Sequence, residues 1–327
     1  MKKLLLGIAA VCLAGFTFAQ DAPLWMRHSV ISPDGTTIAF TYKGDIYTVP
    51  VAGGRAMQIT TNPAYDTAPV WSPDSKRIAF ASDRMGSLDV YIVAKDGGEP
   101  RRLTTHSGSE TPLAFTDAGH ILFSAGIMPS AEAVVFPSNG QFNQVYRVSV
   151  EGGRPTMISS MPMECISINK EGAMLYQDKK GYEDYWRKHH VSPIARDIWM
   201  YTPGKEPQYR QLTTFGGEDR EPVWAPDGKT FYYLSEENGS FNIYRRTPGD
   251  AKAVQLTHYT KNPVRYLSAA TDGRLCYGFD GEIYTLLPGG EAQKVNISIV
   301  SDRNDKDIIR QIKSSGCLLY TSPSPRD

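Results

Sequence analysis

The amino-acid sequence predicts an all-β fold, a six-bladed β-propeller with four antiparallel strands per blade, preceded by a signal peptide. Three observations lead to this prediction. Four landmarks recur in the same order six times along the chain, and each copy spans about 45 residues, the size of one blade. No long window shows the periodicity of an amphipathic helix. A β-sandwich is the competing all-β fold, but it does not require a four-strand unit repeated six times.

The first landmark is a tight turn that follows an apolar segment. It reads Ser-Pro-Asp-Gly at 32–35, Ser-Pro-Asp-Ser at 72–75 and Ala-Pro-Asp-Gly at 225–228, with degenerate forms at 116–119, 170–172 and 271–273. Proline presets φ, aspartate bonds to its own backbone and glycine accepts a positive φ, so these residues favour a turn. The apolar segments before the turns, such as 68–71 and 222–224, are expected to be the innermost strands of the blades.

The other three landmarks predict the remaining strands of each blade. A short alternating strand follows the turn, for example Ile-Ala-Phe at 38–40 and 78–80. A polar–aliphatic–aromatic triplet comes next, at 45–47, 89–91, 144–146, 197–199, 242–244 and 282–284. A glycine turn then leads into a last strand that ends in threonine, serine or asparagine. The six units together account for residues 25–298.

The two ends of the chain fall outside the repeats. Lys2 and Lys3 precede an apolar run that ends in small residues at Ala19, which predicts a signal peptide over 1–19. An uncleaved membrane anchor is the alternative, but the run is short for a spanning helix of about 20 residues. We therefore expect an exported protein, periplasmic or secreted, with the propeller over 20–298, a linker over 299–316 and a non-native tail over 317–327 that resembles translated adapter sequence.

Composition excludes several classes of partner and site. The chain has 35 Lys and Arg against 35 Asp and Glu, so its formal net charge is zero at pH 7. This balance gives no basic footprint for nucleic acid, and no membrane insertion is expected after signal cleavage. Cys12 lies in the predicted signal peptide and Cys317 in the tail. The remaining pair, Cys165 and Cys276, is expected to be two buried free thiols.

The sequence contains no motif that predicts catalysis or a cofactor. A Gly-x-Ser-x-Gly elbow, a Walker loop, a dinucleotide fingerprint and a His-Glu-x-x-His pair are all absent, so we assign no catalytic, cofactor-binding or metal-binding residues. His189 and His190 are adjacent, and adjacent strand residues point to opposite faces, so they make a poor chelate.

Two sets of residues are candidates for peptide contacts. Polar residues next to the inner strands are expected near one mouth of a central channel: His28, Asp66, Glu110, Arg220, Glu221 and Arg265. The alternative is that they are solvated loop charges at strand ends. A long insert in the fourth blade is a candidate gating or partner-binding loop through Tyr182, Trp186, His189 and His190. The alternative there is a loop packed by its own aromatic residues. A second insert spans 127–142.

Two stretches of sequence resemble known families. Residues 71–84, Trp-Ser-Pro-Asp-Ser-Lys-Arg-Ile-Ala-Phe-Ala-Ser-Asp-Arg, together with 89–91 and 102–104, resemble the repeat of TolB-type propellers. The insert from Lys180 to Trp199, the signal peptide and Ser-Asp-Arg-Asn-Asp at 301–305 resemble exported tricorn-type serine peptidases. This second resemblance covers residues 21–316.

The tricorn resemblance implies a domain order and a role. In that family a six-bladed propeller is followed by a seven-bladed one, a helical segment, a PDZ domain and the catalytic core, and no catalytic residue maps onto this chain. The resemblance implies a non-catalytic propeller that guides unfolded peptides and has the downstream domains of the same polypeptide as partners; homo-oligomerisation stays open. The alternatives are a stand-alone TolB-like interaction propeller and the propeller half of a prolyl-oligopeptidase-like enzyme.

Overall fold

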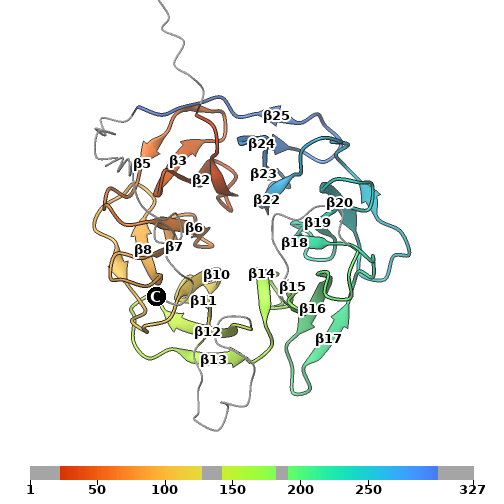
Figure 1. Cartoon of the computed structure of the whole chain (residues 1–327), viewed down its shortest axis with the longest axis horizontal. Helices are drawn as coiled ribbons and strands as arrows, with labels where there is room; N and C mark the ends of the chain where they lie inside the picture. Colours follow the sequence, from red (N-terminus) through yellow and green to blue (C-terminus); the bar gives the residue numbers. More distant parts are fainter. Residues whose placement is uncertain (1–22, 127–141, 182–190, 301–327) are drawn as a thin grey trace, which may run out of the picture.

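The structure, a computed structural model, describes residues 23–126, 142–181 and 191–300. These residues form six four-stranded antiparallel sheets arranged as a ring (Figure 1). In every sheet the strands follow chain order, with the first strand at the centre of the ring and the fourth at its rim. The prediction of a six-bladed propeller with four strands per blade is confirmed.

The strands of blades 1 to 6 fall into four sets by their place in the blade. The inner strands are β1 (Arg27–Ile31), β6 (Asp66–Trp71), β10 (Glu110–Asp117), β14 (Met163–Ile168), β18 (Asp219–Trp224) and β22 (Arg265–Ala269). The second strands are β2 (Thr37–Tyr42), β7 (Arg77–Ser82), β11 (His120–Ala125), β15 (Met174–Asp178), β19 (Phe231–Ser235) and β23 (Leu275–Phe279). The third strands are β3 (Asp45–Pro50), β8 (Asp89–Ala94), β12 (Gln144–Ser149), β16 (Ile198–Thr202), β20 (Asn242–Arg246) and β24 (Glu282–Leu286). The outer strands are β5 (Met57–Gln58), β9 (Arg101–Arg102), β13 (Thr156–Ser159), β17 (Gln208–Gln211), β21 (Val254–Gln255) and β25 (Gln293–Lys294).

The aromatic residue of the polar–aliphatic–aromatic triplet stacks on an aromatic residue of the second strand in the same blade. In blade 1 the register places Phe40 opposite Tyr47, and the two rings stack with centroids 5.8 Å apart. The same pair recurs with centroids 5.6 to 5.9 Å apart at Phe80–Tyr91, Phe123–Tyr146, Tyr233–Tyr244 and Tyr277–Tyr284. Such cross-strand pairs stabilise a sheet, which explains why the triplet repeats.

The threonine that ends the fourth landmark closes its blade. In blade 1 the hydroxyl of Thr60 accepts a hydrogen bond from the backbone N–H of Ile46, at 3.0 Å. Thr104, Thr213 and Thr257 accept the corresponding bond from the third strand at 2.9 Å. The hydroxyl satisfies a buried backbone donor beyond the end of the short outer strand, so a threonine is favoured there.

The hydrophobic core is divided into six clusters, one at each seam between neighbouring blades. Among the described residues, the seam between blades 3 and 4 has the smallest cluster, with five buried residues against eight to twelve at the other seams. These five are Leu122, Val145, Met163, Ile166 and Tyr176. Because burial of apolar surface is the main stabilising term, the described residues give this seam the weakest apolar packing of the six.

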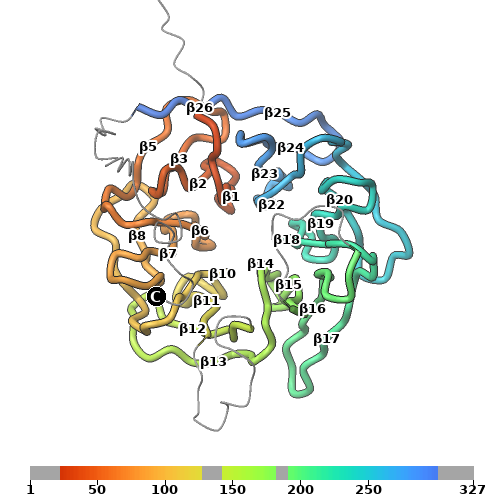
Figure 2. The backbone as a smooth tube through the Cα atoms, in the orientation of Figure 1, coloured from red at the N-terminus to blue at the C-terminus, as the bar shows by residue number. Residues whose placement is uncertain are grey.

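Blades 6 and 1 close the ring without exchanging a strand. At the centre, the backbone N–H of Ile31 donates to the hydroxyl of Ser268 at 3.1 Å. At the rim, β26 (Ile297–Ser298) pairs in parallel with β4 (Gly54–Arg55), where the segment after blade 6 passes the outside of blade 1 (Figure 2). Side chains near β26, including Val295 and Ile297, join the cluster between blades 6 and 1.

Candidate functional site

Every inner strand carries a β-bulge in the same region. The register between inner and second strand shifts between Arg27 and Val30 in blade 1 and at the equivalent residues of blades 2, 4, 5 and 6, whereas in blade 3 it shifts one residue later, between Pro112 and Ala114. The residue directly after Arg27, and its equivalent in each blade, is here called the bulge residue. The bulge residues of blades 1 to 6 are His28, Ala68, Pro112, Cys165, Glu221 and Tyr266, of which Pro112 is still paired with Phe123.

Five of the six bulge residues adopt a left-handed backbone. Their φ angles lie between 49° and 58°, although none of them is glycine. The exception is Pro112 in blade 3, because its ring fixes φ near −65°. A non-glycine residue in this region costs about 1–2 kcal/mol. Since the conformation recurs in five blades, the strain belongs to the bend of the inner strands and does not by itself mark a binding site.

The predicted contact His28 lies at the boundary of blades 6 and 1. Its ring lies tilted against that of Tyr266, with centroids 5.0 Å apart and an interplanar angle of 55°, and its Nδ1 lies 3.1 Å from the hydroxyl of Thr67. Burial, with a smaller contribution from Arg27, lowers the pKa of His28 to about 4, so the ring is neutral at pH 7. Arg265 begins β22 and is half-buried.

Asp66 and Glu110 occupy the same place at the start of their inner strands, yet their partners differ. Both oxygens of Asp66 accept from Nη2 of Arg84, at 3.0 and 2.9 Å, and this guanidinium lies over the ring of Tyr91. Glu110 has the buried carboxylate of Asp89 beside it instead. Burial and Asp89 raise the pKa of Glu110 to about 7, against an opposing hydrogen bond from Thr104.

Arg220 and Glu221 connect blade 5 to both of its neighbours. Nε of Arg220 donates to Oε2 of Glu218 at 2.9 Å. Oε2 of Glu221 accepts from the backbone N–H of Leu267 in blade 6 at 2.8 Å, and the backbone N–H of Glu221 donates to Oε1 of Gln177 in blade 4 at 2.9 Å. Glu221 therefore satisfies polar groups in both neighbouring blades, and Arg220 pairs with Glu218, which directly precedes β18.

The structure thus places four of the six predicted contacts inside the protein. Asp66, Glu110, Arg220 and Glu221 are 0%, 1%, 2% and 6% exposed, so the alternative of solvated loop charges is wrong for them. Their role in peptide contact stays a prediction. The predicted loop contacts Tyr182, Trp186, His189 and His190 lie outside the described residues, as do the predicted signal peptide and tail.

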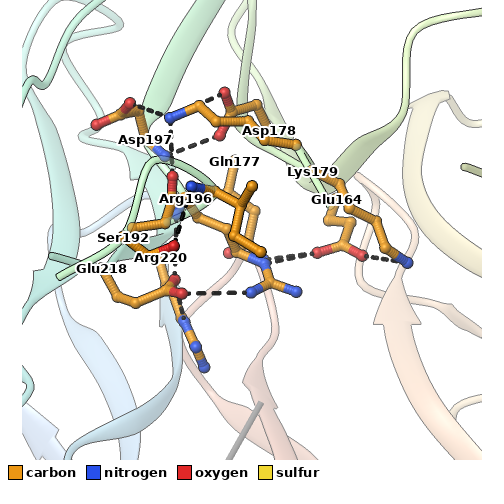
Figure 3. Close-up of polar contacts among 12 residues, drawn as sticks. Glu164, Gln177, Asp178, Lys179, Ser192, Arg196, Asp197, Glu218 and Arg220 are labelled. Atoms are coloured by element: carbon orange, nitrogen blue, oxygen red, sulfur yellow. Dashed lines mark hydrogen bonds and ion pairs between the residues drawn. The ribbon is translucent and has the colours of Figure 1, made fainter. Parts of the chain in front are cut away.

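Sequence reasoning missed a buried polar network between blades 4 and 5 (Figure 3). Arg196, 5% exposed, lies between two carboxylates: Nε donates to Oε2 of Glu164 at 3.1 Å, and Nη1 lies 3.5 Å from Oε1 of Glu218. Burial raises the pKa of Glu164, but Arg196, Gln177 and Lys179 outweigh this and hold it below its usual range. Arg196 therefore connects β14, through Glu164, to the segment before β18, through Glu218.

A second part of the same network joins the two ends of the fourth-blade insert. Nζ of Lys180, before the insert, donates to the carbonyl of Ala195 at 2.8 Å and to Oδ2 of Asp197 at 2.5 Å, both after it. The backbone N–H of Asp197 donates to Oδ1 of Asp178 at 2.8 Å. The clustering of Lys179, Lys180, Arg196 and Asp197 in sequence is the signal that would have indicated it.

The prediction for the two cysteines was half wrong. Both thiols are free, and Cys276 on β23 is buried, but Cys165 is exposed. Cys165 is the bulge residue of β14, whose free edge faces the centre of the ring (Figure 1). Surrounding protein raises the pKa of the Cys165 thiol well above its usual value, and Glu221 and Glu164 add to this effect.

Neither a metal centre nor a membrane span is found in residues 23–126, 142–181 and 191–300. In these ranges no group of three or more His, Cys, Asp or Glu side chains is placed to hold a metal ion. No helix in the same ranges is long and apolar enough to cross a membrane.

Comparison with known proteins identifies the family. The family model for the tricorn protease N-terminal beta propeller domain matches residues 23–292. The chain belongs to the tricorn protease N-terminal propeller family. Tricorn protease homolog 1 from Streptomyces coelicolor is 26% identical over 289 residues, which is 87% of this chain and 26% of that protein. This tricorn-type propeller therefore spans about a quarter of the length of that relative.

Solved structures agree with the tricorn-type fold. The crystal structure of the tricorn protease matches with a TM-score of 0.72 and 19% identity, over 86% of this chain and 27% of that one. TolB from Acinetobacter baumannii matches with a TM-score of 0.61 and 14% identity, over 80% of this chain and 63% of that one. At these identities both matches show the shared fold alone.

Proposed function

We propose that this chain is the non-catalytic propeller of an exported, tricorn-like serine peptidase, and that it guides unfolded peptides toward a catalytic core in another part of a longer polypeptide. The observation that carries the proposal is the family match over residues 23–292, set against a relative of which the match covers about a quarter. The polar groups around the inner strands support a non-catalytic role, because Asp66, Arg220 and Glu221 are bonded to structural partners and are not arranged as a nucleophile and a base.

Two measurements test the proposal. The purified chain is incubated with a fluorescein-labelled unfolded protein, reduced and carboxymethylated α-lactalbumin, and with the native form of the same protein. Fluorescence anisotropy should show binding to the unfolded form only, and gel electrophoresis should show no cleavage of either. Binding to neither form would refute the guiding role. Cleavage that a single substitution in this chain abolished would refute the non-catalytic role.

Export is tested separately. The chain with residues 1–19 and the chain without them are expressed in a Gram-negative host with a carboxy-terminal tag. The proposal expects the longer form in the periplasmic fraction, shortened at its amino terminus, and the shorter form in the cytoplasm. Retention of the longer form in the cytoplasm or the membrane would refute it.

A further inference from the structure

Each inner strand has one edge that is not paired within its blade and faces the centre of the ring. Ile31 pairs with β2 on one side, so a hydrogen bond from its N–H to another blade must leave from this inner edge. Three backbone N–H groups on inner edges are held by side chains of the preceding blade: Ile31 by Ser268 Oγ at 3.1 Å, Trp224 by Ser167 Oγ at 3.0 Å and Leu267 by Glu221 Oε2 at 2.8 Å. The fold therefore caps inner edges with side chains.

The caps come from two places on the preceding inner strand. The first place is the bulge residue. Glu221, the bulge residue of blade 5, caps the N–H of Leu267, which directly follows Tyr266, the bulge residue of blade 6. The other lies two residues later, as with Ser167 and Ser268. In blades 2 and 5 the residue directly after the bulge residue is a proline, Pro69 or Pro222. A proline has no N–H, so this position needs no cap.

Two inner edges, those of β10 in blade 3 and β14 in blade 4, have neither device. At β10 the residues at the two places are Leu113 and Phe115, and the preceding blade offers only Ala68 and Val70, but the bulge residue Pro112 is buried. At β14 the residues at the two places are Ile166 and Ile168, so both carry an N–H. The preceding blade offers Pro112 and Ala114 at the capping places, and neither side chain has a hydrogen-bond acceptor. The N–H groups of Ile166 and Ile168 therefore cannot be capped as those of blades 1, 5 and 6 are.

Two further observations distinguish this edge. Cys165, directly before Ile166, is exposed, so solvent reaches β14 at the bulge. The seam between blades 3 and 4 also has the smallest buried cluster, and several apolar side chains there are only partly buried, including Leu113, Ala114 and Ile168. The edge thus combines open backbone donors with accessible apolar surface.

We propose that an extended peptide binds along the inner edge of β14, pairs its backbone with the N–H groups of Ile166 and Ile168, and places apolar side chains against the seam between blades 3 and 4. Addition of a strand to an open sheet edge obtains its affinity from main-chain hydrogen bonds, so it suits unfolded substrates of varied sequence. The inference rests on the proposed function, since it gives the site at which this propeller would hold an unfolded peptide.

Other blades supply the models for substitutions that close this edge. Because Ile166 is buried in the seam cluster, each variant is first checked for an unchanged far-UV circular dichroism spectrum. Ile166→Pro copies the arrangement of Pro69 and Pro222, which also follow a bulge residue with positive φ. Ala114→Ser adds the hydroxyl that Ser167 and Ser268 supply elsewhere. Val70→Ser is the matched control, because it places the same hydroxyl one blade earlier, at the edge of β10.

The test measures affinity for a fluorescein-labelled twelve-residue peptide of alternating threonine and valine by anisotropy. A second peptide carries N-methyl groups on alternate amides, which prevents strand pairing and keeps the side chains. Loss of one hydrogen bond should weaken binding about fivefold in Ile166→Pro and in Ala114→Ser, and leave Val70→Ser unchanged. The N-methylated peptide should bind more weakly to the wild-type chain, and the unmodified peptide should slow alkylation of Cys165 by iodoacetamide at pH 8.5, followed by peptide mass mapping.

The outcomes separate this site from the proposed function. Wild-type binding that neither substitution nor N-methylation weakens, with no protection of Cys165, would overturn the β14 site and leave the guiding role intact. Weakening by Val70→Ser as strong as that by Ala114→Ser would also overturn it, since the peptide would then pair at β10. Absence of any binding to the wild-type chain would overturn both. Because N-methylation changes only the peptide, a variant that fails to fold does not remove the test.

Discussion

Replacement of Glu110 by glutamine should stabilise the propeller at pH 8 and have little effect at pH 4.5. The side chain is 1% exposed, and burial together with the Asp89 carboxylate raises its pKa from the usual 4.5 to about 7. The folded chain therefore holds this proton more tightly than the unfolded chain does. Between pH 4.5 and 7 the folded state binds more protons, so this group's contribution to stability is fully present at pH 4.5 and is lost as pH rises through 7.

The magnitude follows from the size of the shift. One pKa unit corresponds to about 1.4 kcal/mol, so a shift from 4.5 to about 7 corresponds to about 3 kcal/mol above pH 7. Glutamine has the same shape, carries no charge and can donate a hydrogen bond to Asp89. Glu110→Gln should therefore exceed the wild-type chain in unfolding free energy by about 2–3 kcal/mol at pH 8.

The assay is urea unfolding followed by tryptophan fluorescence at pH 3.0, 4.5, 5.5, 6.5, 7.5 and 8.5. Asp34→Asn is the control of opposite sign, because hydrogen bonds from Ser32 and Thr36 outweigh desolvation and lower the pKa of Asp34. That control should lose its difference from the wild-type chain as pH falls below 4. A Glu110→Gln variant that is less stable than wild type at pH 8.5, or whose difference is the same at every pH, would refute the reasoning.

Three other predictions follow from single contacts. Arg196→Met should lower the unfolding free energy by about 2 kcal/mol in the same urea assay, since it removes the buried cation between Glu164 and Glu218 and leaves them only Lys179 and Arg220, and a loss under 1 kcal/mol would contradict this. Ser268→Ala should cost about 1–2 kcal/mol by uncapping Ile31 at the ring closure, and an unchanged melting temperature would count against it. In native protein at pH 8.5, iodoacetamide should modify Cys165 but not Cys276, which should react only in urea; equal rates would refute the assigned exposures.

The repeating parts of the fold could be predicted from the sequence because each landmark has a local physical cause. The triplet that contains Tyr47 predicts a third strand, and its aromatic residue packs on the strand before it. The threonine at the end of each unit, such as Thr60, marks the end of the outer strand because its hydroxyl closes the blade. These contacts lie within about 15 residues of each other in the sequence, so a regular spacing reveals them.

The environment of the charged residues could not be predicted, because it depends on partners from other strands. Asp66 and Glu110 have equivalent places in the repeat, but only Asp66 has an arginine, Arg84, in the turn beyond its second strand. Glu110 instead faces Asp89 and is raised in pKa. Cys165 was expected to be buried from its apolar neighbours, but the bulge turns it to the open edge. A bulge reverses the side chain order that strand alternation predicts.

The differences among the six blades carry more functional information than their similarities. All six inner strands have a bulge, which is shifted by one residue in blade 3, so a bulge is a requirement of the ring. The residues that cap the inner edges are not repeated: Ser167, Glu221 and Ser268 stand in consecutive blades, and Pro112 and Ala114 stand in blade 3. Uncapped edges attract other strands, and proteins usually block them. A ring that blocks some inner edges and leaves that of β14 open offers a peptide a preferred binding position. This preference comes from a few side chains, because the six blades share the same strand order.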